Sequence, residues 1–249
     1  MKLMLNYFDS VKNHFWLTCC SICLLIVFAS AAAAEYKKPK TTSAPDSRTT
    51  TSTATRGGCI NSKDNNLDLT AIAPYSHVGQ TVSTQPTFFW FVPDSEYFPL
   101  EFHLEEYITD SQLKTIHRQK LDSKPGMMSL SLPQNSPDLK TGNKYRWKVV
   151  MRCTRYKAVV IMAEIQVVTP TPEFQTASNT ISGINRLVDV YSSNGLWYKA
   201  LATTLEAEDS HQLELQKQLI QELAVEETNS KSKWVKQQGD KLNKISDRL

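Results

Sequence analysis

Apolar and polar side chains alternate most clearly in the stretch Tyr145-Arg146-Trp147-Lys148-Val149-Val150-Met151-Arg152-Cys153. One face carries Tyr145, Trp147, Val149, Met151 and Cys153, and the other carries Arg146, Lys148, Val150 and Arg152. This is the two-residue period of a β-strand with one buried face. We therefore expect Tyr145, Trp147 and Cys153 to point into a core. Tyr145 and Trp147 are predicted to be structural residues of that core.

The same period recurs from Cys59 to about Val168 and predicts about seven strands in all. Further runs lie near residues 69–73, 87–92, 101–107, 113–121, 128–132 and 163–168, separated by turn-forming residues. So many short antiparallel strands indicate a two-sheet β-sandwich over residues 59–170. The loop that enters Tyr145 resembles the tyrosine corner of immunoglobulin-like sandwiches, in which the tyrosine hydroxyl bonds to upstream backbone. This favours the immunoglobulin-like type, although a small barrel would show the same alternation.

The run Thr87-Phe88-Phe89-Trp90-Phe91-Val92 is apolar on both faces. Trp90 is predicted to be a structural residue on one face, whereas Phe89 and Phe91 lie on the other, which also requires cover. We expect the C-terminal helices to provide that cover. The alternative is a patch that binds a partner, because large exposed apolar patches usually mark contacts. The candidate residues for such a contact surface are Phe89, Phe91, Trp197 and Tyr198.

After Thr171-Pro172 the apolar residues recur with a helical period, which predicts about four helices in a tail over residues 171–249. The predicted fold class is therefore α+β. Asn194-Gly195 should end the first helix, Asp209-Ser210 should cap the third, and Gly239 weakens the last. The first two helices have the spacing of a peptide-binding tetratricopeptide-type hairpin, but no second copy follows, and we favour two packed helices.

Residues 1–34 have the three parts of an export signal. Lys2 and Lys12 precede an uncharged apolar run, and small residues at 29–31 and 32–34 suit cleavage. We expect a signal peptide that is removed, and a protein in the periplasm or outside the cell. The alternative is an uncleaved anchor, since the 20 uncharged residues from Phe15 to Ala34 are just long enough to span a bilayer.

Residues 35–58 are predicted to be a disordered tether. Ten of the fifteen residues from Thr41 to Thr55 are Ser or Thr, and no large apolar side chain follows Tyr36 in this stretch. Such a segment cannot offset the entropy cost of ordering itself. Three nearby lysines are a weak signal for contact with an anionic membrane, and a solvated spacer explains them better.

The cysteines support export. Three of the five leave with the leader, and Cys59 and Cys153 remain. An even pair in an oxidising compartment usually forms a disulfide, and a bridge across 94 residues would stabilise the fold by about 4–5 kcal/mol. The alternative is two independent buried thiols.

The charge balance argues against a nucleic-acid-binding protein, which normally carries a concentrated positive excess. The 28 basic and 25 acidic residues of the 249-residue chain fall to 26 and 24 when Lys2, Lys12 and Asp9 leave with the leader. No familiar catalytic or metal-binding motif occurs in the mature sequence. We therefore assign no catalytic residue, no metal ligand and no cofactor.

Arg146, Lys148 and Arg152 form a basic stripe on the polar face of their strand. One interpretation is recognition of an acidic glycan or a phosphate. We favour pairing with acidic residues on the neighbouring strands, which stabilises a sheet by about 0.2–1 kcal/mol per pair. The expected partners are Glu101, Glu105 and Glu164.

Several short motifs occur in an order that points to one family. They are Arg56-Gly57-Gly58-Cys59, Leu69-Thr70-Ala71-Ile72-Ala73-Pro74, Gly79-Gln80-Thr81-Val82-Ser83, Pro86-Thr87-Phe88-Phe89-Trp90-Phe91, Gly126 with Ser129-Leu130-Ser131-Leu132-Pro133, Tyr145-Arg146-Trp147, Cys153, and Gly195-Leu196-Trp197-Tyr198-Lys199-Ala200-Leu201-Ala202. Over about residues 56–207 the chain resembles domain of unknown function 928, a bacterial family known mainly from cyanobacteria. The resemblance implies an exported, cysteine-paired module and carries no activity. The chain departs from the family pattern at Lys199 and after Trp234.

Together these patterns predict an exported, non-enzymatic envelope protein that binds through protein or surface contacts. Its expected partner is a protein or an envelope surface and not a nucleic acid, and the leader, if uncleaved, is its only membrane contact. One alternative is an exported hydrolase or glycan-active enzyme without a familiar motif. Another is a membrane-anchored ectodomain that keeps its leader.

Overall fold

Residues 35–40, 42, 44–45, 59, 67–93, 97–134 and 136–249 are described by the computed structural model. All of them belong to one unit, Ala34–Leu249. The predicted leader, residues 1–34, and most of the predicted tether lie outside the described residues.

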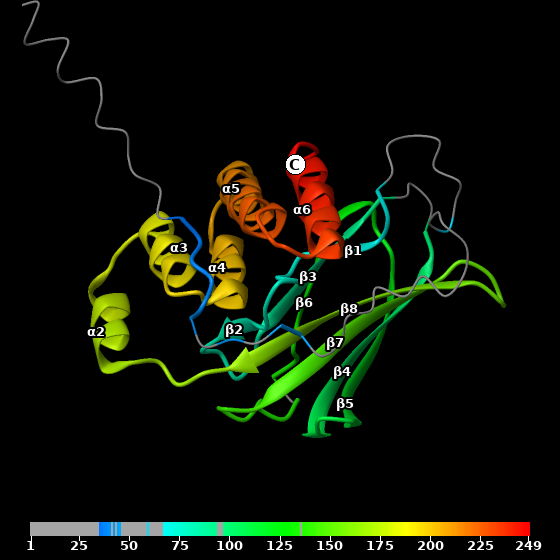
Figure 1. Cartoon of the computed structure of the whole chain (residues 1–249), viewed down its shortest axis with the longest axis horizontal. Helices are drawn as coiled ribbons and strands as arrows, with labels where there is room; N and C mark the ends of the chain where they lie inside the picture. Colours follow the sequence, from blue (N-terminus) through cyan, green and yellow to red (C-terminus); the bar gives the residue numbers. More distant parts are fainter. Residues whose placement is uncertain are drawn as a thin grey trace, which may run out of the picture. The chain divides into compact units, whose positions relative to one another are not determined.

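Two mostly antiparallel sheets contain the strands of the described part (Figure 1). The smaller has the order β1-β3-β6, with β1 (Thr70–Ala71), β3 (Thr87–Val92) and β6 (Gly126–Ser131). The larger has the order β2-β8-β7-β4-β5, with β2 (Gly79–Thr81), β4 (Pro99–Thr109), β5 (Gln112–Asp122), β7 (Lys144–Arg152) and β8 (Ala158–Val167). The parallel pair is β2 with β8.

Aromatic rings join the two sheets face to face. The ring centroid of Phe88 in β3 lies 5.0 Å from that of Phe102 in β4 and 5.5 Å from that of Trp147 in β7. Trp90 lies 6.4 Å from Phe102. The α+β class and the pair of packed sheets are thus confirmed, and the separate sheets rule out the barrel alternative.

One strand, β2, was not predicted from the sequence. β2 has three residues, Gly79, Gln80 and Thr81, and all three are buried, so the segment is too short and too enclosed to show alternation. The predicted number of about seven strands therefore becomes eight in the described residues.

The C-terminal region is helical, as predicted, with an additional first helix. The helices are α2 (Pro172–Thr180), α3 (Ile184–Ser193), α4 (Trp197–Thr203), α5 (Asp209–Thr228) and α6 (Lys233–Ser246), with a short 3-10 turn, η1 (Thr204–Glu206). No residue of α2 is buried, so no apolar period marked it in the sequence. Thr171 caps α2 by accepting a 3.2 Å hydrogen bond from Phe174 N. Among the described residues, no helix is long and apolar enough to cross a membrane.

Asp209 and Gly239 have roles in the helices that differ from those predicted. Asp209 is the first residue of α5, and its N-cap, Glu208, makes no side-chain capping bond. Gly239 does not interrupt α6. A Cβ atom at Gly239 would lie 2.7 Å from Thr228 Cγ2, so glycine permits the close approach of α6 to α5.

Helices cover the second face of β3. In Figure 1 the three-stranded sheet lies between α4–α6 and the five-stranded sheet, and α4 contacts β3. Phe89 and Phe91 point away from the rings that join the sheets, and both are buried. The structure thus agrees with cover by the chain itself.

The start of the predicted tether is ordered against the helices. Tyr36 is buried, its backbone N–H donates to Glu222 Oε2 at 3.0 Å, and its ring packs edge-on against Trp197 at 5.3 Å. A Cβ atom at Gly195 would lie 2.5 Å from Pro39 Cγ, so this glycine leaves room for the segment. Residues 35–40 therefore differ from the tether prediction, because the Tyr36 ring and the backbone hydrogen bonds of Tyr36 and Lys37 hold them against the helices.

Candidate functional site

The predicted structural residues lie in the core. Tyr145, Trp147 and Trp90 are all buried. The Tyr145 hydroxyl accepts a 2.8 Å hydrogen bond from Lys140 N, which confirms the predicted bond to upstream backbone. Trp147 Nε1 donates to the Tyr198 hydroxyl at 2.7 Å, and that hydroxyl donates to the carbonyl of Glu164 at 3.0 Å. These bonds connect α4 to the five-stranded sheet.

The four candidates for an aromatic contact surface do not form a surface. Phe89, Phe91, Trp197 and Tyr198 are all buried, with at most 4% of any residue exposed. Trp197 Nε1 donates to the carbonyl of Ile72 at 3.0 Å, which fixes α4 against the segment after β1. The aromatic character of these residues therefore reflects packing between the sheets and the helices.

Cys59 and Cys153 form a disulfide, as predicted. The bond excludes the alternative of two independent thiols. It attaches the chain upstream of β1 to the end of β7, one residue after Arg152. One end of the five-stranded sheet is thereby covalently held.

Paired charges cover the face of this sheet that points away from the smaller sheet. Glu105 lies opposite Arg146 in the register of β4 and β7. Arg146 Nε donates to Glu105 Oε2 and Lys148 Nζ to Glu105 Oε1, both at 2.7 Å. Burial raises the pKa of Glu105, but the hydrogen bonds from Lys148 and Arg146 outweigh it and hold that pKa below its usual value.

Glu101 is the second acidic centre of this face. Arg118 Nη2 approaches Glu101 Oε2 at 2.6 Å, His103 Nε2 at 3.3 Å and Arg152 Nη2 at 3.6 Å. The hydrogen bond from Arg118 is the main cause that lowers the pKa of Glu101 to about 2. Burial lowers the pKa of His103. Glu101 thus carries one negative charge and has two arginine side chains, Arg118 and Arg152, within 4 Å of it.

The cross-strand interpretation of the basic stripe is confirmed for Glu101 and Glu105. The third expected partner, Glu164, lies opposite Arg146 in register; the Tyr107 hydroxyl donates to Glu164 Oε1 at 2.6 Å, and Lys144 Nζ lies 3.8 Å from Glu164 Oε2. The stripe is therefore primarily part of the sheet's own structure.

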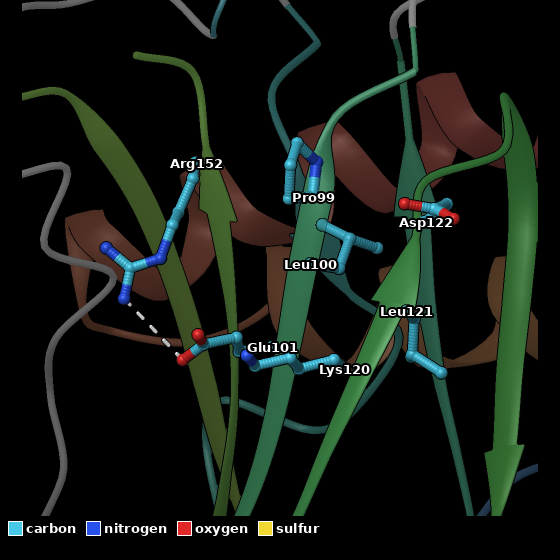
Figure 2. Close-up of a pocket in the computed structure, with 7 residues that line it drawn as sticks. All are labelled: Pro99, Leu100, Glu101, Lys120, Leu121, Asp122 and Arg152. Atoms are coloured by element: carbon cyan, nitrogen blue, oxygen red, sulfur yellow. Dashed lines mark ion pairs between the residues drawn. The ribbon is translucent and has the colours of Figure 1, made fainter. Parts of the chain in front are cut away.

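A hollow of about 430 Å³ opens beside Glu101 (Figure 2). It is lined by Pro99, Leu100, Glu101, Lys120, Leu121, Asp122 and Arg152. Figure 2 shows Arg152 and Lys120 reaching toward Glu101 from two sides, with Asp122 set apart from them. The hollow therefore combines cations, a carboxylate acceptor and aliphatic walls.

Two exposed tyrosines lie at the same end of the sheet. Tyr156, 90% exposed, occupies the turn between β7 and β8, and Tyr97, 74% exposed, lies two residues before β4. β4 and β7 are neighbours with Leu100 opposite Met151, which places both tyrosines at one end. We define the tyrosine–arginine end by Tyr97, Lys120, Arg152, Arg155 and Tyr156.

Sequence reasoning missed both tyrosines. One usable signal was present, because Tyr156 sits in a tight turn, where Gly, Asn, Asp, Pro and Ser are the usual residues. An aromatic side chain in such a turn lies beyond the ends of the strands, where no core is available to bury it. Tyr97 had no comparable signal.

A second polar cluster lies where α5 meets the loop before β2. The Tyr36 hydroxyl lies 2.6 Å from His77 Nε2, and Ser76 Oγ lies 2.8 Å from His77 Nδ1 and donates to Glu227 Oε1 at 2.9 Å. The backbone N–H groups of Tyr75 and Ser76 also donate to Glu227, each at 3.1 Å. Burial lowers the pKa of His77 to about 3 and raises the pKa of Glu227.

This cluster is organised to hold a loop. Because the Ser76 proton is donated to Glu227, His77 does not receive it, and a neutral imidazole with so low a pKa is a weak base. The backbone N–H groups of Tyr75 and Ser76, which could otherwise stabilise an oxyanion, are taken by Glu227. Among the described residues, no group of three or more His, Cys, Asp or Glu side chains is placed to hold a metal ion.

Comparison with known proteins identifies one family. The family described as Domain of Unknown Function (DUF928) matches residues 51–233. That range includes both cysteines, all strands of the two sheets and the helices through α5. No curated protein matches the chain.

Proposed function

We propose a function for this chain, which belongs to the DUF928 family. It is an exported, non-enzymatic envelope protein that acts through contacts at the tyrosine–arginine end. The observation that carries the proposal is the exposure of Tyr156 and Tyr97 at the end of the sheet that also holds Arg152. Tyrosine and arginine are enriched where proteins make contacts, and this end of the sheet presents both in solvent.

Export is supported by two features. The first is the three-part leader over residues 1–34. The second is the Cys59–Cys153 disulfide, because such bonds persist mainly in oxidising compartments. We propose that the leader is removed near Glu35, in the periplasm or during secretion.

We also propose that the sandwich is of the immunoglobulin-like type. The support is the bond between Lys140 N and the Tyr145 hydroxyl, which has the form of a tyrosine corner. In this type, loops gather at the ends of the sheets and often bind partners. The turn that carries Tyr156 is a loop of this kind.

Photo-crosslinking in intact cells tests the contact proposal. A photoreactive phenylalanine analogue replaces Tyr156 in the full chain, and its control replaces Ile108, which is 51% exposed near the far end of β4. We expect an envelope component to become attached at position 156 and much less at position 108. Equal attachment at the two positions, or none at 156, would refute the proposed contact site.

A further inference from the structure

We infer that the tyrosine–arginine end binds an acidic glycan, a chain of sugar residues that carry carboxylates. This inference rests on the proposed function and names the chemical class of its ligand. Three features of the described residues lead to it: spare positive charge, a hollow of mixed polarity and exposed aromatic rings.

The spare charge comes from the imbalance around Glu101. Arg118 makes the short contact, at 2.6 Å, whereas Arg152 Nη2 lies 3.6 Å away and its side chain is 52% exposed. Lys120 lies opposite Glu101 in register and has no ion pair within the described residues. Two cations can therefore turn to a ligand without breaking the strongest bond of the cluster. An arginine guanidinium is well suited to a carboxylate, which it binds with two parallel hydrogen bonds.

The shape of the hollow suits a ligand with both charge and hydroxyl groups. Its volume of about 430 Å³ lies in the range of small-molecule sites. Leu121, which is partly exposed, supplies aliphatic surface, and Arg152 and Lys120 supply donors. Asp122, set apart from those cations in Figure 2, is an acceptor for hydroxyl groups. A simple anion such as phosphate would gain nothing from Asp122, whereas a sugar acid uses both kinds of group.

The tyrosines do not line the hollow but lie at the same end of the sheet. A sugar ring has faces made of C–H groups, which pack on an aromatic ring while its hydroxyls stay in water. Tyr156 and Tyr97 offer such rings to solvent. Arg155 lies 5.9 Å from the centre of the Tyr156 ring and adds a further cation there.

An acidic peptide would satisfy the charge but not the remaining features. Peptide recognition relies on an open strand edge, a helix groove or a pocket for an anchor side chain. The hollow lies on a strand face between β7, β4 and β5 and not along the outer edge of β5, the end strand of the sheet. Leu100, which would floor an anchor pocket, is already buried. Flat, separate aromatic rings suit repeating sugar units better.

The test is direct binding of the full-length exported protein to fluorescein-labelled polygalacturonate, measured by fluorescence anisotropy. We expect Arg152→Gln with Lys120→Gln to weaken binding about tenfold or more, and Tyr156→Ala to weaken it several-fold. Matched controls at the far end of the sheet, Lys114→Gln and Ile108→Ala, should leave the affinity within about twofold. The unfolding midpoint of each variant, measured in parallel, should be unchanged, which separates lost binding from lost folding.

Other polymers give the outcomes that overturn the inference. Polyglutamate and inorganic polyphosphate carry charge without sugar rings, and dextran carries rings without charge. Equal binding of polygalacturonate, polyglutamate and polyphosphate, with no effect of Tyr156→Ala, would show attraction by charge alone and would refute the inference. Absence of polygalacturonate binding would also refute it. If crosslinks to a protein still formed at position 156, the proposed contact function would stand while the glycan inference failed.

Discussion

Two regions of the molecule bury carboxylates, and each surrounds them with different partners. On the five-stranded sheet, Glu101 and Glu105 lie among arginine and lysine side chains, and their pKa values are lowered. Where α5 meets the loop before β2, Glu227 accepts hydrogen bonds from two backbone N–H groups and a hydroxyl, and its pKa is raised. The two regions thus shift the pKa of the same side-chain group in opposite directions.

This difference distinguishes a sheet surface that can bind a ligand from a junction whose role is to hold the loop before β2 against α5. On the sheet the cations outnumber the carboxylates, so charge remains for a ligand. At the junction the described donors around Glu227 are all engaged, and its second oxygen, Oε2, is buried without a partner among the described residues. We therefore expect substitutions at the junction to change stability and substitutions at the sheet end to change binding.

The largest effect is expected for Glu227→Ala. The change leaves the N–H groups of Tyr75 and Ser76 buried without their acceptor and opens a gap beneath the loop. Each unsatisfied group costs about 1–3 kcal/mol, so the free energy of unfolding should fall by about 3–5 kcal/mol in urea denaturation. Glu214→Ala, at an exposed position of the same helix, is the control and should cost less than about 0.5 kcal/mol. A loss no greater than the control would show that the junction is not held by Glu227.

A smaller loss is expected for Glu105→Gln on the sheet. Arg146 and Lys148 lose their shared counter-charge, but both side chains are 23% exposed and can turn to water. Solvent screening limits the cost to about 1–2 kcal/mol, measured in the same denaturation experiment. A loss that equals or exceeds that of Glu227→Ala would contradict the distinction between the two regions.

Glu227→Gln should reveal whether the charge of the Glu227 carboxylate stabilises or destabilises the fold. A raised pKa in the folded state means that the carboxyl stabilises the fold below the usual glutamate pKa and loses that contribution as the pH rises through the folded value. Glutamine stays neutral, so its stability relative to the parent should improve between pH 4 and pH 7. A relative stability that falls over this interval would mean that the Glu227 charge is favourable.

Glu101→Gln should show the opposite trend. The pKa of Glu101 is lowered to about 2, so its favourable contribution is present above the usual glutamate pKa of about 4.3 and is lost as the pH falls toward 2. The parent should lose stability over this acid interval, and the variant should lose less. Identical acid profiles of unfolding would show that the ion pairs of Glu101 contribute nothing, as many exposed pairs do.

Local patterns in the sequence predicted a large part of the sheet. The alternation at residues 145–153 predicted the buried face of β7 and the pairing of its basic residues with Glu101 and Glu105. The two cysteines outside the predicted leader predicted the disulfide. These features follow from the local period and composition of the sequence, and predicting them requires no knowledge of which distant segments meet in the fold.

The contacts that sequence could not predict join distant segments. Glu227 meets Ser76 across 151 positions, and Tyr36 meets Glu222 across 186. Nothing in the local sequence distinguishes Glu227 from its neighbour Glu226. The exposed tyrosines were missed for a related reason, since the exposure of a turn residue depends on what packs beside it. The sequence leaves the aromatic run of β3 as a possible surface because the helix that contacts it, α4, begins more than 100 residues later in the chain.

Hydroxyl-radical footprinting of the full-length protein with and without isolated envelope tests the central claim most directly. The method measures how fast exposed side chains are oxidised, and tyrosine and isoleucine both react. We predict protection of Tyr156 and Tyr97 when envelope is present, with the oxidation of Ile108 unchanged. Protection centred on Ile108, or no protection at either tyrosine, would contradict the assignment of contact to this end of the sheet.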